Sequence, residues 1–398
     1  MNFKETIGYN VIRKWLAEKE FEPFDYQLEA WELISRGECG LVNAPTGYGK
    51  TFSVFLGVLI QYINEHPTDY LSKAPQCLQL LWVSPLRALG KDIGRAMEEV
   101  IRDLGMPWTV GIRNGDTTTA ERQRQKRQSP EILIITPESL HLLLAQKGYP
   151  TLFRSLRIIA VDEWHELIGS KRGVLVELAI SRLVNLKGLN TPIPDDAVQH
   201  AVPDGPDRAN NLAPVKSGAS QKGKPAKTKN NSNHLSVFGI SATIGNLGEA
   251  RDVLLAPTGR TGNIITARLP KKTEIISIFP DEIEKYPWSG HLGLKLVHKI
   301  IPIIEASTTT LLFINTRGMS ERWYQAILDV APQLAGAIAL HHGSIEQDLR
   351  IWVEEALHAG TLKCVVCTAS LDLGVDFRPV ETVIQVGSPK GVARFMQR

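Results

Sequence analysis

Two short strings in this chain have the residue types and spacing needed to bind and cleave a nucleoside triphosphate. Residues 44–51 read APTGYGKT, and residues 162–165 read DEWH. Glycine-rich loops that end in Lys and Thr cradle phosphates, and adjacent carboxylates hold Mg²⁺ and activate water. Chance supplies either string, but rarely both in this order and each at the end of an expected strand. We therefore predict a site that binds a nucleoside triphosphate with Mg²⁺ and hydrolyses it.

The first string is expected to form a strand-to-helix turn. Gly47 and Gly49 permit positive φ and close backbone approach, so their N–H groups and the helix N-terminus can bind an anion. Lys50 would reach the β- and γ-phosphates, and the Thr51 hydroxyl would ligate Mg²⁺. Ala44 stands where the general pattern begins with Gly, which leaves the phosphate-facing end intact. The alternative interpretation is a glycine turn with a chance Gly-Lys-Thr.

The second string follows the apolar, β-branched run at 157–161, which is typical of a central parallel strand. Ligands bind at the carboxyl ends of strands in open α/β sheets. Asp162 would hold Mg²⁺ directly or through water. Glu163 would be the general base that orients and deprotonates the attacking water. Two solvated carboxylates at a strand end are the alternative, which the phosphate loop disfavours.

Two α/β lobes are expected to position these groups. Apolar runs alternate with helical patterns, as in a parallel sheet covered on both faces. The first lobe has expected strands near 41, 81, 110, 133 and 158 and a later one at 234–240. The second has expected strands at 310–315, 337–340, 364–367 and 382–386.

The domain limits are expected where the composition changes. We predict a first domain at 1–263, a connection at 264–305 and a second domain at 306–398. The connection carries a helical apolar stripe, interpreted as core, at Leu294, Val297, Ile300, Ile301 and Ile304. Residues 189–233 are rich in Pro, Asn, Gly, Ser, Ala and Lys, and we interpret them as a disordered insertion within the first domain. Their lysines could attract DNA, but a solvated tether is the favoured interpretation.

Overall composition bounds the class of protein without identifying it. The chain has 398 residues, 43% hydrophobic content and a formal net charge of +3, which suits a globular protein and does not by itself indicate nucleic acid. A local cluster at Arg122, Arg124, Lys126 and Arg127 is either a nucleic-acid patch or a solvated helix face.

The N-terminus and the apolar runs suggest no membrane segment. The charged first twenty residues read as an amphipathic helix with the stripe Phe3, Ile7, Val11, Trp15 and Leu16, rather than as a signal peptide. The longest apolar stretch, 52–60, is too short to span a membrane. We expect a cytoplasmic monomer that does not bind a membrane.

The cysteines give a second possible metal site. Cys364 and Cys367 have zinc-like spacing, but they lie in an expected strand, where residues three apart face opposite ways. We interpret all four cysteines as thiols of a reducing compartment.

Polar strings recur at the ends of expected strands in both lobes. They are SPLR at 84–87, TPES at 136–139, SAT at 241–243, NTR at 315–317, HHGS at 341–344 and TAS at 368–370. Each alone could be a helix N-cap. Together they form a rim of hydroxyls, amides and arginines, the groups that contact a phosphate backbone.

This set of strings resembles the superfamily 2 helicases of the DExH type. The resemblance is to the large helicase-related (Lhr) family, and within it to the ligase-associated DEXH-box DNA helicases. Its most specific stretches are 161–167, 241–246, 287–293 and 387–394. The resemblance covers nearly the whole chain except 189–233, and it implies an α/β fold of two tandem RecA-like P-loop domains with parallel sheets.

The resemblance also implies a role for each matching residue. Phe24 and Gln27 match an adenine-recognition segment, and Thr46, Gly374 and Asp376 match further nucleotide-facing positions. The match to the element that couples hydrolysis to movement is carried by His165, Ser241 and Thr243. The strand-contacting positions are Arg87, Thr136, Thr316, Arg317, His342, Gly343 and Thr368.

The activity implied by the resemblance is ATP-dependent movement along single-stranded DNA or a tailed duplex. It implies the 3′-to-5′ direction and a role in DNA repair with a DNA ligase and a nuclease. The family pattern continues beyond Arg398 into arginines that reach the γ-phosphate. We therefore expect the second domain of this chain to be incomplete at its C-terminus, and the chain to bind ATP but hydrolyse it slowly.

Three other classes of protein would differ from this expectation in a defined way. An RNA helicase differs only in which nucleic acid stimulates the ATPase. A non-catalytic nucleic-acid-binding fragment would bind strands without ATP turnover. A non-helicase ATPase, such as a transporter subunit, would leave Thr316, Arg317, His342 and Gly343 without a role.

Overall fold

All strands in the described part of the chain lie in two parallel β-sheets, of seven and four strands. The computed structural model describes residues 2–45, 47–72, 77–188, 235–242, 244–268, 274–281, 293–371, 380–388 and 395. The predicted insertion and four predicted site residues (Thr46, Thr243, Gly374 and Asp376) lie outside these ranges. The predicted α/β class with two parallel-sheet domains is confirmed.

The first sheet has the strand order β3-β4-β2-β5-β6-β1-β7, and every neighbouring pair is parallel. Its strands are β1 (Gly40–Asn43), β2 (Leu80–Val83), β3 (Val110–Arg113), β4 (Ile132–Ile135), β5 (Ile158–Val161), β6 (Ser236–Ser241) and β7 (Asn263–Thr266). The near-continuous apolar sequence of β2, β4 and β5 follows from burial on both faces.

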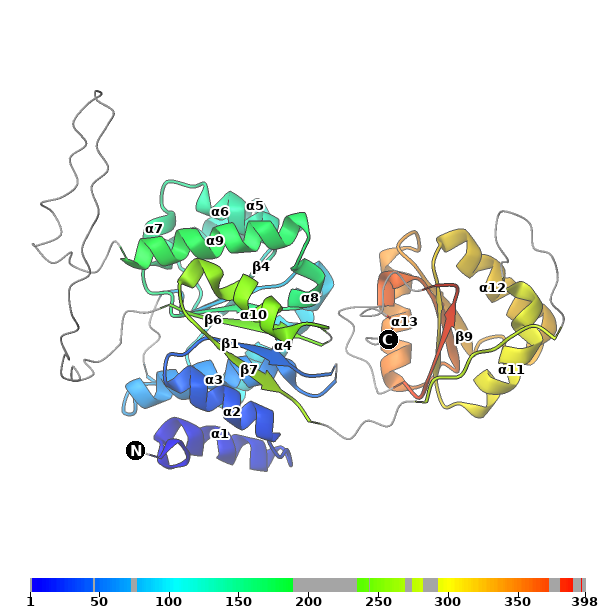
Figure 1. Cartoon of the computed structure of the whole chain (residues 1–398), viewed down its shortest axis with the longest axis horizontal. Coiled ribbons are helices and arrows are strands. Elements are labelled where there is room, and N and C mark those ends of the chain that lie inside the picture. Colours follow the sequence, from blue (N-terminus) through cyan, green and yellow to red (C-terminus); the bar gives the residue numbers. More distant parts are fainter. Residues whose placement is uncertain are drawn as a thin grey trace, which may run out of the picture.

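Helices cover both faces of this sheet (Figure 1). One face packs on α1 (Ile7–Glu18), α2 (Asp25–Ser35), α3 (Lys50–Glu65) and α4 (Arg87–Asp103). The other packs on α6 (Pro137–Leu144), α7 (Tyr149–Phe153), α8 (Trp164–Leu167), α9 (Lys171–Gly188) and α10 (Leu247–Leu255). The short helix α5 (Thr119–Arg127) follows β3. These two layers make the sheet a rigid platform for the loops at its carboxyl edge.

The N-terminal amphipathic helix is present, but its buried face differs from the predicted stripe. Helix α1 follows the 3₁₀ turn η1 (Phe3–Glu5) and buries Tyr9, Ile12, Trp15 and Leu16. Ile7, predicted to be in the stripe, is 48% exposed at the first turn. Trp15 and Leu16 are buried as predicted, and Phe3 and Val11 are partly buried against the same core. Tyr9 and Ile12 are the buried residues that the predicted stripe lacked, and α1 packs on α3.

The second sheet has the order β11-β8-β10-β9, again all parallel. Its strands are β8 (Thr310–Ile314), β9 (Ile338–His341), β10 (Cys364–Cys367) and β11 (Thr382–Val386). Its helical elements are η4 (Leu294–Leu296), α11 (Val297–Ala306), α12 (Arg317–Val330), η5 (Pro332–Leu334), α13 (Gln347–Ala359) and η6 (Ala369–Leu371). Cys364 and Cys367 are buried in two different core clusters, so they face opposite sides of β10 as their spacing predicts.

Residues 264–305, predicted as a connection, contain most of a strand of the first sheet and a helix that packs in the core beside the second sheet. Strand β7 extends the first sheet to Thr266, and 3₁₀ turn η3 (Ala256–Thr258) precedes it. The predicted helical stripe is core in α11, where Val297, Ile300 and Ile304 are buried beside α12. The stretch between the last strand of one sheet and the first turn of the other is therefore 267–293.

The strand order places the candidate chemistry at one edge of the first sheet. Strand β6 lies between β5 and β1, so the residues that follow these three strands meet at their carboxyl ends. No helix in the described ranges is both long and apolar enough to cross a membrane.

Candidate functional site

The phosphate loop connects the end of β1 to the start of α3. Gly47 and Gly49 have φ of 83° and 72°, left-handed values at which a side chain would be strained. Gly49 is the N-cap of α3, so the first helical residue is Lys50. The helix N-terminus and its free N–H groups therefore face the loop, as an anion site requires.

Three buried polar atoms near this loop make no hydrogen bond to any described residue: Lys50 Nζ, Glu163 Oε2 and Asn43 Oδ1. Lys50 Nζ lies 3.8 Å from Glu163 Oε1, and each side chain is more than nine-tenths buried. A buried ammonium without hydrogen bonds is destabilising unless an anion completes its surroundings. These residues therefore fit a triphosphate, and the Thr51 hydroxyl in the first turn of α3 fits a Mg²⁺ ligand.

The acidic pair sits directly after β5. Asp162 and Glu163 are 5% and 6% exposed, and Asp162 Oδ1 accepts a hydrogen bond of 2.9 Å from the Glu163 N–H. Burial, and secondarily the charge of Glu163, raise the pKa of Asp162 above its usual range. Two buried carboxylates beside the loop lysine suit a divalent cation, which takes one or two protein carboxylates together with substrate phosphates.

Glu163 has a backbone conformation that is unusual for its residue type. Its φ is 46°, which makes it the left-handed N-cap of α8. Trp164 anchors this turn, because it is fully buried and its indole N–H donates to the Ala250 carbonyl at 2.8 Å. Trp164 thus has a structural role, because its packing and hydrogen bond fix the turn that positions Glu163.

His165 connects the acidic pair to strand β6. Its Nδ1 lies 3.1 Å from Ser241 Oγ and 3.4 Å from Glu163 Oε2. The structure therefore brings His165 and Ser241, two of the predicted coupling residues, into contact with each other beside Glu163. The third, Thr243, lies outside the described residues.

Gln27 already bonds the protein backbone through both ends of its amide. Its Oε1 accepts from the Phe24 N–H at 3.0 Å, and its Nε2 donates to the Gly49 carbonyl at 3.0 Å. The amide therefore ties α2 to the phosphate loop, and only one further hydrogen bond at each atom remains for adenine.

Phe24 belongs to an aromatic group that sequence reasoning did not identify. Its ring is 38% exposed, stacks on Tyr26 at 5.9 Å and meets Tyr48 edge-on at 5.9 Å. The Tyr26 hydroxyl donates to the Tyr48 carbonyl within the phosphate loop. The sequence signal for this aromatic group was Tyr48, which stands between Gly47 and Gly49. A tight turn does not itself require an aromatic side chain at such a position.

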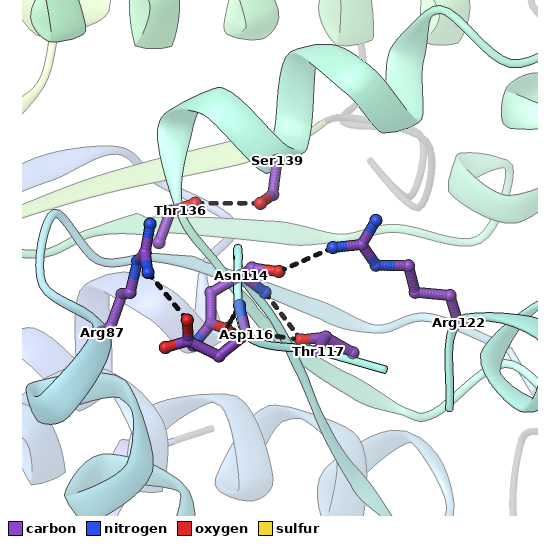
Figure 2. Close-up of polar contacts among 7 residues, drawn as sticks. All are labelled: Arg87, Asn114, Asp116, Thr117, Arg122, Thr136 and Ser139. Carbon is purple, nitrogen blue, oxygen red and sulfur yellow. Dashed lines mark hydrogen bonds and ion pairs between the residues drawn. The ribbon is translucent and has the colours of Figure 1, made fainter. Parts of the chain in front are cut away.

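The strand-contacting candidates of the first lobe lie at the ends of β2 and β4, which are neighbours in the sheet (Figure 2). Arg87 begins α4, and Thr136 is the N-cap residue of α6, with its hydroxyl donating to Ser139 Oγ at 3.0 Å. Both residues line a small hollow between these strand ends, which Ser84, Arg113 and Asn114 also line.

The candidates of the second lobe gather at the carboxyl edge of the second sheet. Thr316 is the N-cap residue of α12, and the next residue, Arg317, donates through Nη1 to Ser344 Oγ at 2.6 Å. His342 Nε2 lies 3.2 Å from Glu321 Oε1. Gly343 and Thr368 follow β9 and β10, which pair with each other.

His341, which was not a predicted site residue, ties three of these elements together. Its Nδ1 lies 2.8 Å from Ser370 Oγ and its Nε2 lies 3.1 Å from Glu354 Oε1 on α13. Burial, followed by the charges of Arg350 and His342, lowers the pKa of His341 to about 4. The ring is therefore neutral near pH 7 and fixes the loop that begins at Thr368.

The lowered pKa of His341 predicts a loss of stability in mild acid. The unfolded imidazole takes up a proton below pH 6.5, its ordinary pKa, whereas the folded one does so only near 4. Stability should therefore fall by up to about 3 kcal/mol as the pH drops through this window. The raised pKa of Glu354 offsets part of this loss, because that carboxyl gains protons on folding.

Chemical denaturation between pH 7 and pH 4 measures the effect. The variant His341→Gln should show a shallower dependence of the unfolding free energy on pH than the unmodified protein. Equal slopes for the two proteins would show that His341 does not titrate on unfolding in this range.

A glycine loop that ends in a buried lysine and a strand-end acidic pair lie on one parallel sheet, and a second parallel sheet follows. This arrangement defines a P-loop nucleotide-binding protein. Comparison with family profiles agrees. Residues 24–197 match the DEAD/DEAH box helicase family and residues 294–398 match the helicase conserved C-terminal domain. The chain thus carries a DEAD/DEAH box helicase domain and a helicase conserved C-terminal domain, and it is similar to the Lhr helicases.

The individual relatives show how far this similarity extends. The chain is 32% identical to ATP-dependent helicase Lhr-Core protein 2 of Thermococcus barophilus, over 97% of this chain and 41% of that protein. It is 30% identical to the Lhr helicase/uracil glycosylase of Escherichia coli K12, over 97% of this chain and 26% of that protein. The chain thus spans less than half the length of these relatives.

Solved structures agree with these sequence matches. The Mycobacterium smegmatis helicase Lhr bound to ssDNA and AMP-PNP is 28% identical, with a TM-score of 0.66 over 98% of this chain and 45% of that one. The DUF1998 helicase MrfA bound to DNA has a TM-score of 0.71 at 22% identity, which shows a shared fold.

Proposed function

We propose that this protein is an ATP-dependent motor that moves along single-stranded DNA and separates duplexes. The observation that carries the proposal is the buried chain of contacts from Lys50 through Glu163 and His165 to Ser241. It joins a triphosphate-binding loop to a neighbouring strand, and a coupled ATPase needs such a connection.

The residues of the chain divide the hydrolysis between them. Lys50 and the N–H groups at the start of α3 bind and orient the phosphates, and Thr51 with Asp162 would hold Mg²⁺. A Mg²⁺ ion held there would neutralise negative charge on the phosphates of ATP. Glu163 accepts the proton of the attacking water. Its buried carboxylate is suited to this role because it lies beside Lys50, which binds the phosphates.

In this proposal His165 links the occupancy of the phosphate site to the conformation of strand β6. A change at Glu163 alters a contact of 3.4 Å to the His165 ring, and the same nitrogen contacts Ser241 Oγ. The segment after Ser241 then carries the change towards the second domain. In this proposal Thr243 shares the coupling role, and Gly374 and Asp376 take part in nucleotide binding.

Nucleic acid is proposed to lie along the carboxyl edges of the two sheets. Arg87, Thr136 and the second-lobe group at Thr316, Arg317, His342, Gly343 and Thr368 offer guanidinium, hydroxyl and backbone donors there. These groups bind phosphates without reading bases. DNA is favoured because the relative of known structure described above is bound to ssDNA.

The test is ATP turnover with single-stranded DNA and with RNA of the same sequence. We expect DNA to stimulate turnover more than RNA, and Arg87→Ala with Arg317→Ala to remove the stimulation while leaving basal turnover. Greater stimulation by RNA would indicate an RNA helicase. Strand binding without turnover would indicate a nucleic-acid-binding protein that does not hydrolyse ATP.

The finer parts of the proposal concern direction and context. We infer 3′-to-5′ movement and a role in DNA repair beside a DNA ligase and a nuclease, because of the resemblance to the ligase-associated helicases. Duplexes with a 3′ or a 5′ tail distinguish the directions, and only the 3′-tailed duplex should be unwound.

A further inference from the structure

Arg87 holds its guanidinium in a defined place although the side chain is well exposed. Nη1 donates to Asp116 Oδ1 at 2.7 Å, and the side chain is 60% exposed (Figure 2). A guanidinium has five N–H donors, and a phosphate takes two of them in a fork. The donors not used by Asp116 are therefore open to a phosphate.

Gly115 gives the guanidinium its resting surface. A Cβ built on Gly115 would lie 2.7 Å from Arg87 Nη2 and 2.9 Å from its Cζ. The guanidinium therefore lies directly against the backbone of residue 115, where no side chain other than hydrogen fits beside it. The φ of Gly115 is not in the left-handed region, so the backbone conformation does not require glycine at this position.

The loop 114–117 is held rigidly by its own side chains. Asn114 Oδ1 accepts from the Asp116 N–H at 2.9 Å, and Thr117 Oγ1 accepts from the Asn114 N–H at 2.9 Å. Such side-chain bonds to the backbone fix tight turns. The position of Asp116 relative to Gly115 is therefore set within the loop.

Side chains of helix α5 donate hydrogen bonds to the backbone of this loop and of the strand before it. Arg122 donates to the Asn114 carbonyl at 3.1 Å, and Gln125 donates to the Ile112 carbonyl at 3.1 Å. Arg124 instead pairs with Glu121. The basic cluster of α5 thus includes one arginine that supports the loop and one that is neutralised on its own helix.

The same device recurs in the second lobe. Arg317 begins α12 as Arg87 begins α4, and a Cβ on Gly343 would lie 3.2 Å from Arg317 Nη2. The residue after this glycine, Ser344, accepts from Arg317 Nη1, as Asp116 accepts from Arg87 Nη1. Two independent loops therefore present a helix-start arginine over a glycine and tie it to the next residue.

We propose that loop 114–117 is a positioning element that orients Arg87 for a strand phosphate, with Gly115 and Asp116 as its positioning residues. The inference rests on the proposed strand-binding role of Arg87. An exposed ion pair adds little affinity by itself. Its effect is to restrict the rotamers of a long side chain before the strand binds, which lowers the entropy lost on binding.

Gly115→Ala is the sharpest probe of this element. The added methyl group meets the end of a flexible side chain, so Arg87 moves and the fold does not. The change alters no charge, unlike Asp116→Ala, which removes the anchor and a repulsive negative charge together. We expect Gly115→Ala to weaken single-strand binding about fivefold, as for one misaligned charge-assisted hydrogen bond.

The experiment measures strand affinity of the full chain in a double-variant cycle with Arg87→Ala. In the Arg87→Ala background, Gly115→Ala should change affinity by less than about twofold, because the side chain that it displaces is gone. Gly148→Ala is the matched control, since a Cβ there meets no atom within 4 Å. Nitrogen-15 spectra of the Arg87 side chain, recorded without nucleic acid, should show a restrained guanidinium that becomes mobile in Gly115→Ala.

The outcomes separate this inference from the function on which it rests. If Arg87→Ala weakens binding but Gly115→Ala does not, the positioning role is wrong and the strand-contact role stands. An equal loss in both backgrounds also overturns the positioning role, because the effect then bypasses Arg87. If Arg87→Ala leaves binding unchanged, the strand-contact role fails and the inference fails with it.

Discussion

Replacing Glu163 with Gln should lower ATP turnover by about 100-fold or more, the contribution of a well-placed general base. The amide keeps the size of the side chain but cannot accept a proton from water. Nucleotide affinity should be retained, because Lys50 and the start of α3 are untouched. Steady-state turnover and binding of a fluorescent ATP analogue measure the two effects separately.

The matched control for this variant is Glu166→Gln, three residues further along the same short helix. It removes the same charge without changing the group beside Lys50, so turnover should stay within about twofold of the unmodified protein. Turnover by Glu163→Gln near the unmodified level would remove Glu163 from the role of base.

Replacing Lys50 with Met should lower ATP affinity about 30-fold or more, the expected loss when one partner of a buried charge pair is removed. The unfolding free energy should fall by about 3 kcal/mol, because the change removes the cation beside Glu163 and leaves that buried carboxylate uncompensated.

The double variant Lys50→Met/Glu163→Gln sharpens this expectation. It removes both buried charges, so it should unfold at a free energy equal to or higher than that of the unmodified protein, while ATP binding stays lost. The control is Lys14→Met on α1, where the lysine side chain is 81% exposed and neither property should change. Lower stability of the double variant would show that the pair holds the fold rather than the nucleotide.

Most of the sheet framework could be predicted from the sequence, because buried parallel strands are short apolar runs between helical patterns. The runs at β2, β4 and β5 are unambiguous for this reason. Strand β7 was not predicted, since only one of its residues, Ile265, is buried and the strand lies at the sheet edge beside β1. Its pairing with β1 depends on contacts distant in the sequence, which no local pattern contains.

The candidate site divides in the same way. Lys50, Asp162 and Glu163 could be predicted because each belongs to a short string whose chemistry requires a fixed spacing. Lys50 lies in the phosphate loop, and the two carboxylates follow one strand. Gly115 and His341 could not, because each acts on a side chain from another strand end. The dipeptides Gly115-Asp116 and Gly343-Ser344 resemble ordinary turns until the arginine that rests on each is located in space.

The position of β6 has a consequence for how the protein becomes active during synthesis. The phosphate loop follows β1 and the acidic pair follows β5, but these strands are not neighbours; β6 lies between them and begins only at Ser236. A nascent chain that has released all residues through α9 therefore has both halves of the ATP site but no strand to join them. Because domains fold as cooperative units and long-range strand pairing is slow, the site assembles only after Ser241 has left the ribosome.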